Sequence, residues 1–301
     1  MAAVNKIIFE KPDLAFLRSK YTVFDLHFHT HYSDGRNSVE AIAKKARELG
    51  IGVAITDHNE ISGALEIEKH KGVLSIPGIE ITSSEGTHIL VYFYETASLR
   101  KFYRKYIKPF TGSDPMRSTK LPMEEIIDSA RMFKCVTIFP HPYCAAYTGL
   151  YNLNFSAGRI DRLLDDIDGV EVINAENIHR WNLQCALLGF NLGKAITGGS
   201  DGHSLYHMGK VVTYAACPKT GAAFLNAVKN QQAGVIGKEI NLIRKVASSS
   251  AKLNVNIMNY PELLGKNFRY SYRLINIKSR MIKDSLRSSL RRRKGKFRTI
   301  I

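Results

Sequence analysis

Residues 25–35 read DLHFHTHYSDG, and this stretch decides the fold. His27 and His29 are separated by one residue, and side chains at i and i+2 of a strand point to the same face. The preceding residues, 21–26, are rich in aromatic and β-branched types, which favours a strand. Two imidazoles on one face of an extended chain can bind one metal ion. Because such a pair alone is weak support for a site, the rest of the chain has to supply further ligands.

Later apolar runs repeat one local design, in which a short predicted strand adjoins a side chain that can bind metal. The runs are residues 53–57, 73–79, 89–94, 135–140 and 195–200. The adjoining side chains are His58, Glu80, His88, His141, Asp201 and His203. Parallel-barrel enzymes place reactive groups at the carboxyl ends of strands, so we expect these side chains to meet at one end of a barrel.

Helical patterns alternate with these strands. The clearest is residues 38–49, where Val39, Ile42, Ala43 and Ala46 share one face and Gly50 follows as a stop. Similar patterns cover residues 123–133, 160–164, 181–190 and 224–228. Alternation of this kind predicts a parallel sheet covered by helices, and no internal repeat is visible.

The ordered motifs carry a resemblance to a known family. They are DLHxHTxxSDG, TDH at residues 56–58, PGIE at 77–80, PHP at 140–142 and GSDxH at 199–203. With these motifs the chain resembles the PHP (polymerase and histidinol phosphatase) superfamily from about residue 23 to about residue 216. The resemblance implies a distorted (β/α)7 barrel and a metal-dependent phosphoesterase.

The resemblance also implies a set of ligands for two or three divalent metal ions. The ligands implied for the first metal are His27, His29, Glu80 and Asp201, those for the second are Glu80, His88 and His141, and those for the third are Asp34, His58 and His203. Asp34 stands where some members carry histidine, which implies a more oxygen-rich third site. Imidazole and carboxylate ligands suit zinc, manganese or iron, and the sequence does not choose among them. We also expect Asp57 to orient a ligand histidine through its free ring nitrogen.

Taken singly, each of these residues has an ordinary structural interpretation. A histidine at a strand end is more often a hydrogen-bonded structural residue than a ligand, and Asp34 in SDG suits a turn. The order of all nine positions favours the metal site over nine separate coincidences.

Composition bounds the rest of the architecture. With 301 residues, 45% of them hydrophobic, the chain can bury one substantial core and an appendage. The cysteines (Cys135, Cys144, Cys185 and Cys217) stand far apart without CxxC spacing, which suits a reducing compartment. The first residues lack the apolar region of a secretory signal, and no run reaches the length of a membrane span. We therefore expect a cytoplasmic protein.

The net charge of +16 is concentrated in the last fifth of the chain. Residues 239–301 carry 16 Lys and Arg against three Asp and Glu, whereas the first 238 residues have a balance of only +3. This shift predicts a phosphoesterase barrel at residues 1–237 and a basic helical extension at residues 238–301. The extension also contains a predicted amphipathic helix. Its cationic side comprises Arg273, Arg280, Lys283, Arg287, Arg291 and Lys294, and its apolar side comprises Leu274, Ile275, Ile277, Met281, Ile282 and Leu286.

Three interpretations of this helix are open. In the first, the helix packs on the barrel and leaves its basic face in solvent. In the second, it attaches the protein to an anionic membrane surface as a peripheral protein, and in the third it binds nucleic acid. The oligomeric state is not predicted.

For the reaction, we expect a metal-bridging hydroxide to attack phosphorus, with Asp34 or His203 assisting the leaving group. Arg117 is the first cation expected to contact substrate, with Lys120 and Arg180 as further candidates. The compact barrel favours a small phosphomonoester as substrate. The alternative is a nuclease or nucleotide phosphatase that acts on RNA or DNA ends, with the basic extension gathering substrate. A non-catalytic metal-binding module is disfavoured, because nine ligands exceed the needs of a closed structural site.

Overall fold

Strands and helices alternate along the chain, as the sequence pattern predicts. The computed structural model describes residues 6–144, 149–152 and 155–240. The strands are β1 (Ile7–Ile8), β2 (Thr22–Phe28), β3 (Gly52–Ile55), β4 (Ser75–Thr82), β5 (His88–Phe93), β6 (Cys135–Phe139), β7 (Gly169–Asn174), β8 (Ala195–Gly199), β9 (Val211–Ala215) and β10 (Ala233–Gly237). The α-helices are α1 (Leu14–Lys20), α2 (Val39–Leu49), α3 (Ser62–Ile67), α4 (Thr96–Phe102), α5 (Met123–Arg131), α6 (Ala157–Asp166), α7 (His179–Leu192) and α8 (Gly221–Lys229). A π-helical turn η1 (Tyr103–Ile107) and 3-10 turns η2 (Lys108–Phe110) and η3 (Leu150–Asn152) complete the set.

Helix α2 shows how local chemistry sets the ends of these elements. The hydroxyl of Ser38 accepts a hydrogen bond from the backbone N–H of Ala41 and caps the first turn. Gly50 ends the helix in the left-handed conformation, with φ of 65°. The buried face consists of the four residues that the apolar spacing predicts, Val39, Ile42, Ala43 and Ala46.

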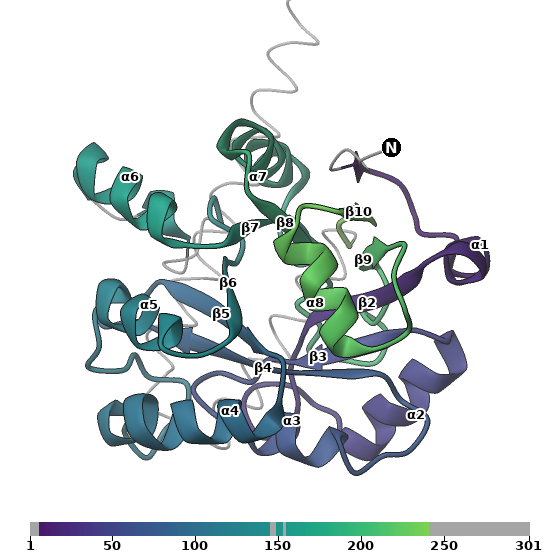
Figure 1. Cartoon of the computed structure of the whole chain (residues 1–301), viewed down its shortest axis with the longest axis horizontal. Helices are drawn as coiled ribbons and strands as arrows, with labels where there is room; N and C mark the ends of the chain where they lie inside the picture. Colours follow the sequence, from purple (N-terminus) through teal and green to yellow (C-terminus); the bar gives the residue numbers. More distant parts are fainter. Residues whose placement is uncertain (1–5, 145–148, 153–154, 241–301) are drawn as a thin grey trace, which may run out of the picture. The chain divides into compact units, whose positions relative to one another are not determined.

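The strands form one sheet in the order β1-β10-β9-β2-β3-β4-β5-β6-β7-β8. The sheet curves so that the end of β8 returns to β2, where the N–H of His29 donates to the carbonyl of Gly202 at 3.0 Å. Glycine at position 199 permits this approach, because an added Cβ would lie 2.4 Å from the Cβ of His27. Strands β2 to β8, with helices outside them, confirm the predicted distorted α/β barrel (Figure 1).

Two strand directions differ from the prediction of a parallel sheet. Strand β9 is antiparallel to both β2 and β10, and strand β5 is antiparallel to both β4 and β6. For β5 the reason is the short turn after β4, in which the N–H of Ser83 donates to the carbonyl of Thr87 at 2.8 Å. A turn of this length can join only antiparallel strands, since a parallel pair needs a long crossover. As a result His88, at the start of β5, lies at the same end of the sheet as the carboxyl end of β4.

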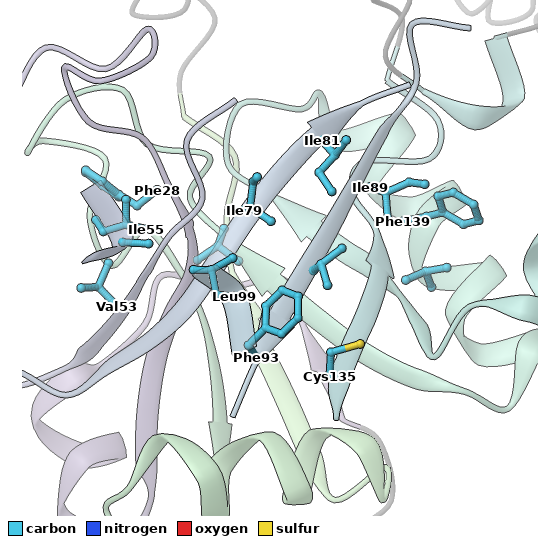
Figure 2. Packing of buried hydrophobic residues seen from close by; sticks show 14 of the residues in the cluster. Phe28, Val53, Ile55, Ile79, Ile81, Ile89, Phe93, Leu99, Cys135 and Phe139 are labelled. Carbon is cyan, nitrogen blue, oxygen red and sulfur yellow. The ribbon is translucent and has the colours of Figure 1, made fainter. Parts of the chain in front are cut away.

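Two apolar layers stabilise the sheet, one on each face. The inner layer includes Phe24, Leu26 and Tyr92 and packs against α8, where the rings of Phe24 and Phe224 are 4.5 Å apart. The outer layer joins the strands to the surrounding helices, and Figure 2 shows part of it, including Ile79, Ile89 and the α4 residue Leu99. All four cysteines are free thiols. Among the described helices, none has the length and apolar character that a bilayer span requires.

The chain divides into two compact units, residues 1–248 and 249–301. The second unit, with the predicted basic helix, lies outside the described residues. Strand β10 ends at Gly237, the position where the change in charge predicts a boundary. Beyond it, Ile240 is still buried, and its N–H donates to the carbonyl of Ala175 at 3.0 Å.

Candidate metal centre

A bulge in β2 aims its two histidines into the centre. The pairing with β3 shifts between Asp25 and Phe28, so β2 contains one extra residue there. Leu26 belongs to the inner apolar layer, whereas Phe28 belongs to the outer one. The extra residue therefore reverses the alternation and turns both His27 and His29 inward, as bulges beside functional sites commonly do.

The structure brings together all nine residues that the family resemblance implies as ligands. Their nitrogen and oxygen atoms form four overlapping groups, each within 4.8 Å. The groups are His27/His29/Asp201, His27/Glu80/His141, His58/Glu80/His88 and His29/Asp34/His58/His203. The residues come from β2, the following loop, and the ends or starts of β3, β4, β5, β6 and β8. All except Asp201 are buried, and the Asp201 side chain is only 16% exposed.

Glu80 occupies the middle of this cluster. Its Oε1 lies 2.8 Å from His88 Nδ1 and 3.4 Å from His141 Nε2. Its Oε2 lies 3.1 Å from His58 Nδ1, 3.3 Å from His27 Nε2 and 3.4 Å from His29 Nε2. One carboxylate facing five imidazoles has the position required of a ligand shared between metal ions.

The other two carboxylates, Asp201 and Asp34, lie beside further imidazoles of the cluster. Asp201 Oδ1 lies 3.1 Å from His29 Nε2 and 3.6 Å from His27 Nε2. Asp34 Oδ2 lies 2.9 Å from His203 Nε2, and Asp34 Oδ1 is 3.8 Å from His58 Nε2. His29 lies beside both carboxylates, with its Nδ1 3.7 Å from Asp34 Oδ1, so the two groups share this histidine.

Strained backbone marks three strand ends at the centre. Asn59, His141 and Asp201 have φ values of 48°, 33° and 48°, in the left-handed region. Such conformations cost on the order of 1–3 kcal/mol each in non-glycine residues and concentrate at functional sites. Here they follow β3, β6 and β8 and direct neighbouring side chains toward the cluster.

Burial and neighbouring charges shift the pKa values of the clustered side chains in opposite directions. Burial lowers the pKa of His58 to about 3, so its ring is neutral across the physiological range. Burial also opposes charge on His27, but Asp201, Glu80 and Glu171 raise its pKa well above the ordinary value. Although burial disfavours the charged form of Glu80, its histidine neighbours hold its pKa well below the ordinary value. The carboxylates therefore remain charged and require positive charge beside them.

The donor atoms fit divalent cations. Several buried atoms of the cluster lie close to opposite charges but form no aligned hydrogen bond within the described residues, although a buried polar atom normally has one. They are His27 Nε2, His29 Nδ1, Asp34 Oδ1, His58 Nδ1, Glu80 Oε2, His141 Nδ1 and His203 Nε2. Lone pairs of nitrogen and oxygen gathered at this spacing suit metal ions with mixed imidazole and carboxylate ligands.

The sequence did not predict two functional residues on β7. Glu171 Oε1 lies 3.1 Å from His27 Nδ1, and Glu171 Oε2 accepts the backbone N–H of His141 at 3.0 Å. The Asn174 amide donates to Glu171 and to Asp201, at 2.9 and 3.3 Å. A carboxylate on the far nitrogen of a histidine ligand fixes the tautomer and raises its basicity. The available signal was a glutamate inside the apolar run GVEVI at residues 169–173.

Asp57 does not orient a histidine ring, so that prediction was wrong. Its carboxylate accepts the N–H and hydroxyl of Thr30, both at 2.7 Å, and the hydroxyl of Ser33 at 2.6 Å. It thus fixes the loop that carries Asp34. Asp25 fixes the loop after β8 in the same way, because its carboxylate accepts the N–H groups of Ser200 and Gly209 at 2.9 Å each.

The predicted substrate cations lie at the surface. The Arg117 side chain is 52% exposed, and its Nε is 3.6 Å from Asp114. Lys120 and Arg180 are also exposed. The loop around Arg117 is fixed beside the centre, because the amide of Asn59 donates to the carbonyls of Pro115 and Arg117 at 2.8 and 2.9 Å. We call the loop that carries Arg117 the rim loop, because it borders the metal centre. The role of Arg117 in catalysis stays a prediction.

Comparisons with known proteins identify the family of this sequence. The family described as PHP domain matches residues 25–136, and the family described as PHP-associated matches residues 179–233. The uncharacterised protein MJ1587 of Methanocaldococcus jannaschii is 34% identical over 167 residues, which cover 50% of this chain and 81% of that protein.

Solved structures share the fold. One is a two-domain protein of Bacteroides vulgatus that contains a predicted PHP-like metal-dependent phosphoesterase, with a TM-score of 0.54, 16% identity and coverage of 78% of this chain and 69% of that chain. Another is the lesion-specific endonuclease Q of Pyrococcus furiosus, with a TM-score of 0.58, 21% identity and coverage of 71% and 57%.

Proposed function

This chain belongs to the PHP-domain family of metal-dependent phosphoesterases, and from that membership we propose that it hydrolyses a small phosphomonoester at a centre of two or three divalent metal ions. The observation that carries the proposal is the arrangement of Glu80, which faces five imidazoles within 3.4 Å in the cluster that also contains Asp34 and Asp201. A purely structural metal site uses four ligands and needs no carboxylate shared among so many imidazoles.

The cations would lower the pKa of a bound water and neutralise charge on the phosphoryl oxygens. Glu171 holds the His27 ring in position through Nδ1, and Asn174 holds Asp201. We assign His203 and Asp34, 2.9 Å apart, to assisting the leaving oxygen through a third metal ion that they would help to hold. We assign Arg117 to binding a phosphoryl oxygen at the rim.

The size of the substrate follows from the loops around the centre. Between β5 and β6, the segment before α5 lies against the end of β4, where both the N–H and the hydroxyl of Thr119 donate to the carbonyl of Thr82. This rim leaves the barrel without a separate substrate-binding subdomain among the described residues. A compact rim favours a small phosphomonoester.

A second candidate is a nuclease or nucleotide phosphatase that acts on the ends of RNA or DNA. A row of exposed cations on α4, η1 and η2, next to the rim loop, favours this candidate. The predicted basic extension points to the same class of substrate by composition.

The test is a phosphoester panel combined with elemental analysis. Purified protein should contain two or three equivalents of zinc, manganese or iron and release phosphate from p-nitrophenyl phosphate. Glu80→Gln and Asp201→Ala should abolish turnover, whereas Glu125→Gln, an exposed carboxylate on α5, should not. Cleavage of diesters or oligonucleotides alone would favour the second candidate. A full metal complement without hydrolysis of any phosphoester would leave only a metal-binding module.

A further inference from the structure

A row of exposed cations runs along the helical segment that leads to the rim of the metal centre. The segment is continuous from α4 through η1 to η2, residues 96–110. Its exposed cations are Arg100, Lys101, Arg104, Lys105 and Lys108. They recur at intervals of four residues in two adjacent lines, while Leu99, Phe102, Tyr103 and Ile107 are buried on the opposite side. The cations therefore share one outward face, which we name the α4 cationic face.

The charge of this face is not neutralised nearby. The sequence has no Asp or Glu from residue 96 to residue 113. In the described part of the chain, none of the five cations forms an ion pair; Lys105 and Lys108 lie only over the rings of Tyr106 and Tyr103, at 4.8 and 5.8 Å. Like charges at i and i+4 destabilise a helix. An uncompensated row of cations on one face is the electrostatic pattern of a surface that binds a polyanion.

The same segment leads to the metal centre. Phe110, 39% exposed, ends the row, and its carbonyl accepts the N–H of Lys120 at 3.0 Å. From there the rim loop reaches Asn59, which is adjacent to His58. The middle of the segment, η1, is π-helical, and such turns are frequent at functional sites. Four of the cations also line a shallow surface depression with Ala97.

We propose that the α4 cationic face, with Phe110 at its end, binds the phosphate backbone of a single-stranded nucleic acid. Proteins bind such strands with a line of cations that follows the backbone and with exposed aromatic rings that stack on bases. An anionic membrane is a poorer match, because the apolar side that an interfacial helix would insert is buried against the barrel here. The inference goes beyond the proposed hydrolysis, since binding does not require an active centre.

The test measures binding by the full-length protein. A fluorescein-labelled oligothymidylate is titrated across a series of salt concentrations, and fluorescence anisotropy gives the dissociation constant. The double substitution Arg100→Glu with Arg104→Glu should weaken binding by about tenfold or more. It should also reduce the slope of log K against log salt by about 1.4, because each phosphate contact with a single strand contributes about 0.7. The neutral pair Arg100→Gln with Arg104→Gln should give a smaller loss.

The matched control is Lys11→Glu with Lys44→Glu, which makes the same change in net charge at two exposed positions, one before α1 and one on α2. It should leave the slope unchanged. Equal losses in both double variants would overturn the proposal in favour of a general charge effect. Loss of binding to phosphatidylserine vesicles, with oligothymidylate binding intact, would overturn it in favour of a membrane.

Turnover of p-nitrophenyl phosphate is measured on the same proteins. We expect it to be unchanged by the α4 substitutions. A protein that binds the strand but hydrolyses no phosphoester would contradict the proposed function and leave this inference standing.

Discussion

Glu171 and Asn174 show how one extra residue in a strand changes which side chains reach a site. Strand β7 pairs with β8 through a shift between Glu171 and Ile173. The shift places both polar side chains on the inner side, where they contact His27, Asp201 and each other. A strand without a bulge would point residues 171 and 174 to opposite faces.

Glu171→Gln should weaken metal binding by about 10–100-fold, the usual effect of removing a carboxylate behind a histidine ligand. The glutamine retains the size of the side chain but removes the charge that holds His27. A competition titration against a chromophoric chelator measures the affinity. Asp161→Asn, an exposed carboxylate on α6, is the control and should bind metal normally. Equal affinity in both variants would show that Glu171 does not support the centre.

The raised pKa of His27 predicts how metal affinity depends on pH. In the metal-free site its proton compensates Asp201, Glu80 and Glu171, so this contribution to stability is present at low pH and is lost as pH rises through the raised pKa. A bound cation takes the place of that proton, and affinity should therefore increase with pH, by up to about tenfold per unit for each proton displaced. Isothermal titration calorimetry at pH 7 in two buffers of different ionisation enthalpy should detect the release of about one proton. Affinity that does not vary with pH would contradict this account.

The nine ligand positions could be predicted because each lies in a recognisable sequence motif. Each ligand is an unusual residue type beside an apolar run, so the ordered motifs identify all nine positions that the structure gathers. The supporting residues were not predictable in the same way. Asp57 lies next to a ligand yet bonds to the hydroxyls of Thr30 and Ser33, because the loop brings these closer than any imidazole.

At the scale of elements, the apolar pattern could not predict the direction of a strand. Every predicted strand and helix within the described residues exists, because periodicity reports burial on one face. Burial is the same for a parallel and an antiparallel strand, so the direction of β5 depends on the turn at residues 83–87. That turn puts His88 opposite Thr82, two residues from Glu80.

Asn59 joins the rim loop to the ends of β3 and β4, and its removal should affect substrate binding more than chemistry. Its amide holds the carbonyls of Pro115 and Arg117, and its Oδ1 accepts the N–H of Thr82 at 2.9 Å. In Asn59→Gly these bonds are lost, while glycine accepts the φ of 48° without strain. We expect KM for p-nitrophenyl phosphate to rise about tenfold, equal to 1.4 kcal/mol, with a smaller change in kcat.

Arg117→Ala serves as the comparison for Asn59→Gly. If the loop acts by presenting Arg117, the two single variants and the double variant should have similar KM values, because effects within one unit are not additive. Additive losses would mean that Asn59 and Arg117 act separately.

At the scale of the whole molecule, charge and packing define different boundaries. The balance of +13 in residues 239–301 begins next to Gly237, but the buried Ile240 belongs with the barrel, since it packs with the outer apolar layer. Glu239 also reaches back to the barrel, where its carboxylate lies 3.2 Å from His179 Nδ1. A change in the density of charged residues reports how a segment interacts with solvent. Buried contacts report which residues fold together. The domain boundary predicted from charge therefore stays a prediction.

A chain shortened to end at Gly237 should accordingly be less stable than one shortened to end at Ser248. Loss of Ile240 removes a buried side chain, worth about 2 kcal/mol in the free energy of unfolding, together with its hydrogen bond to Ala175. Urea denaturation of the metal-free proteins should therefore show a lower midpoint for the shorter chain. The chain that ends at Ser248 keeps residues 238–240 and serves as the reference for this comparison. Equal midpoints for the two shortened chains would mean that residues 238–240 add nothing to the barrel and that the change in charge at Gly237 is also the limit of folding.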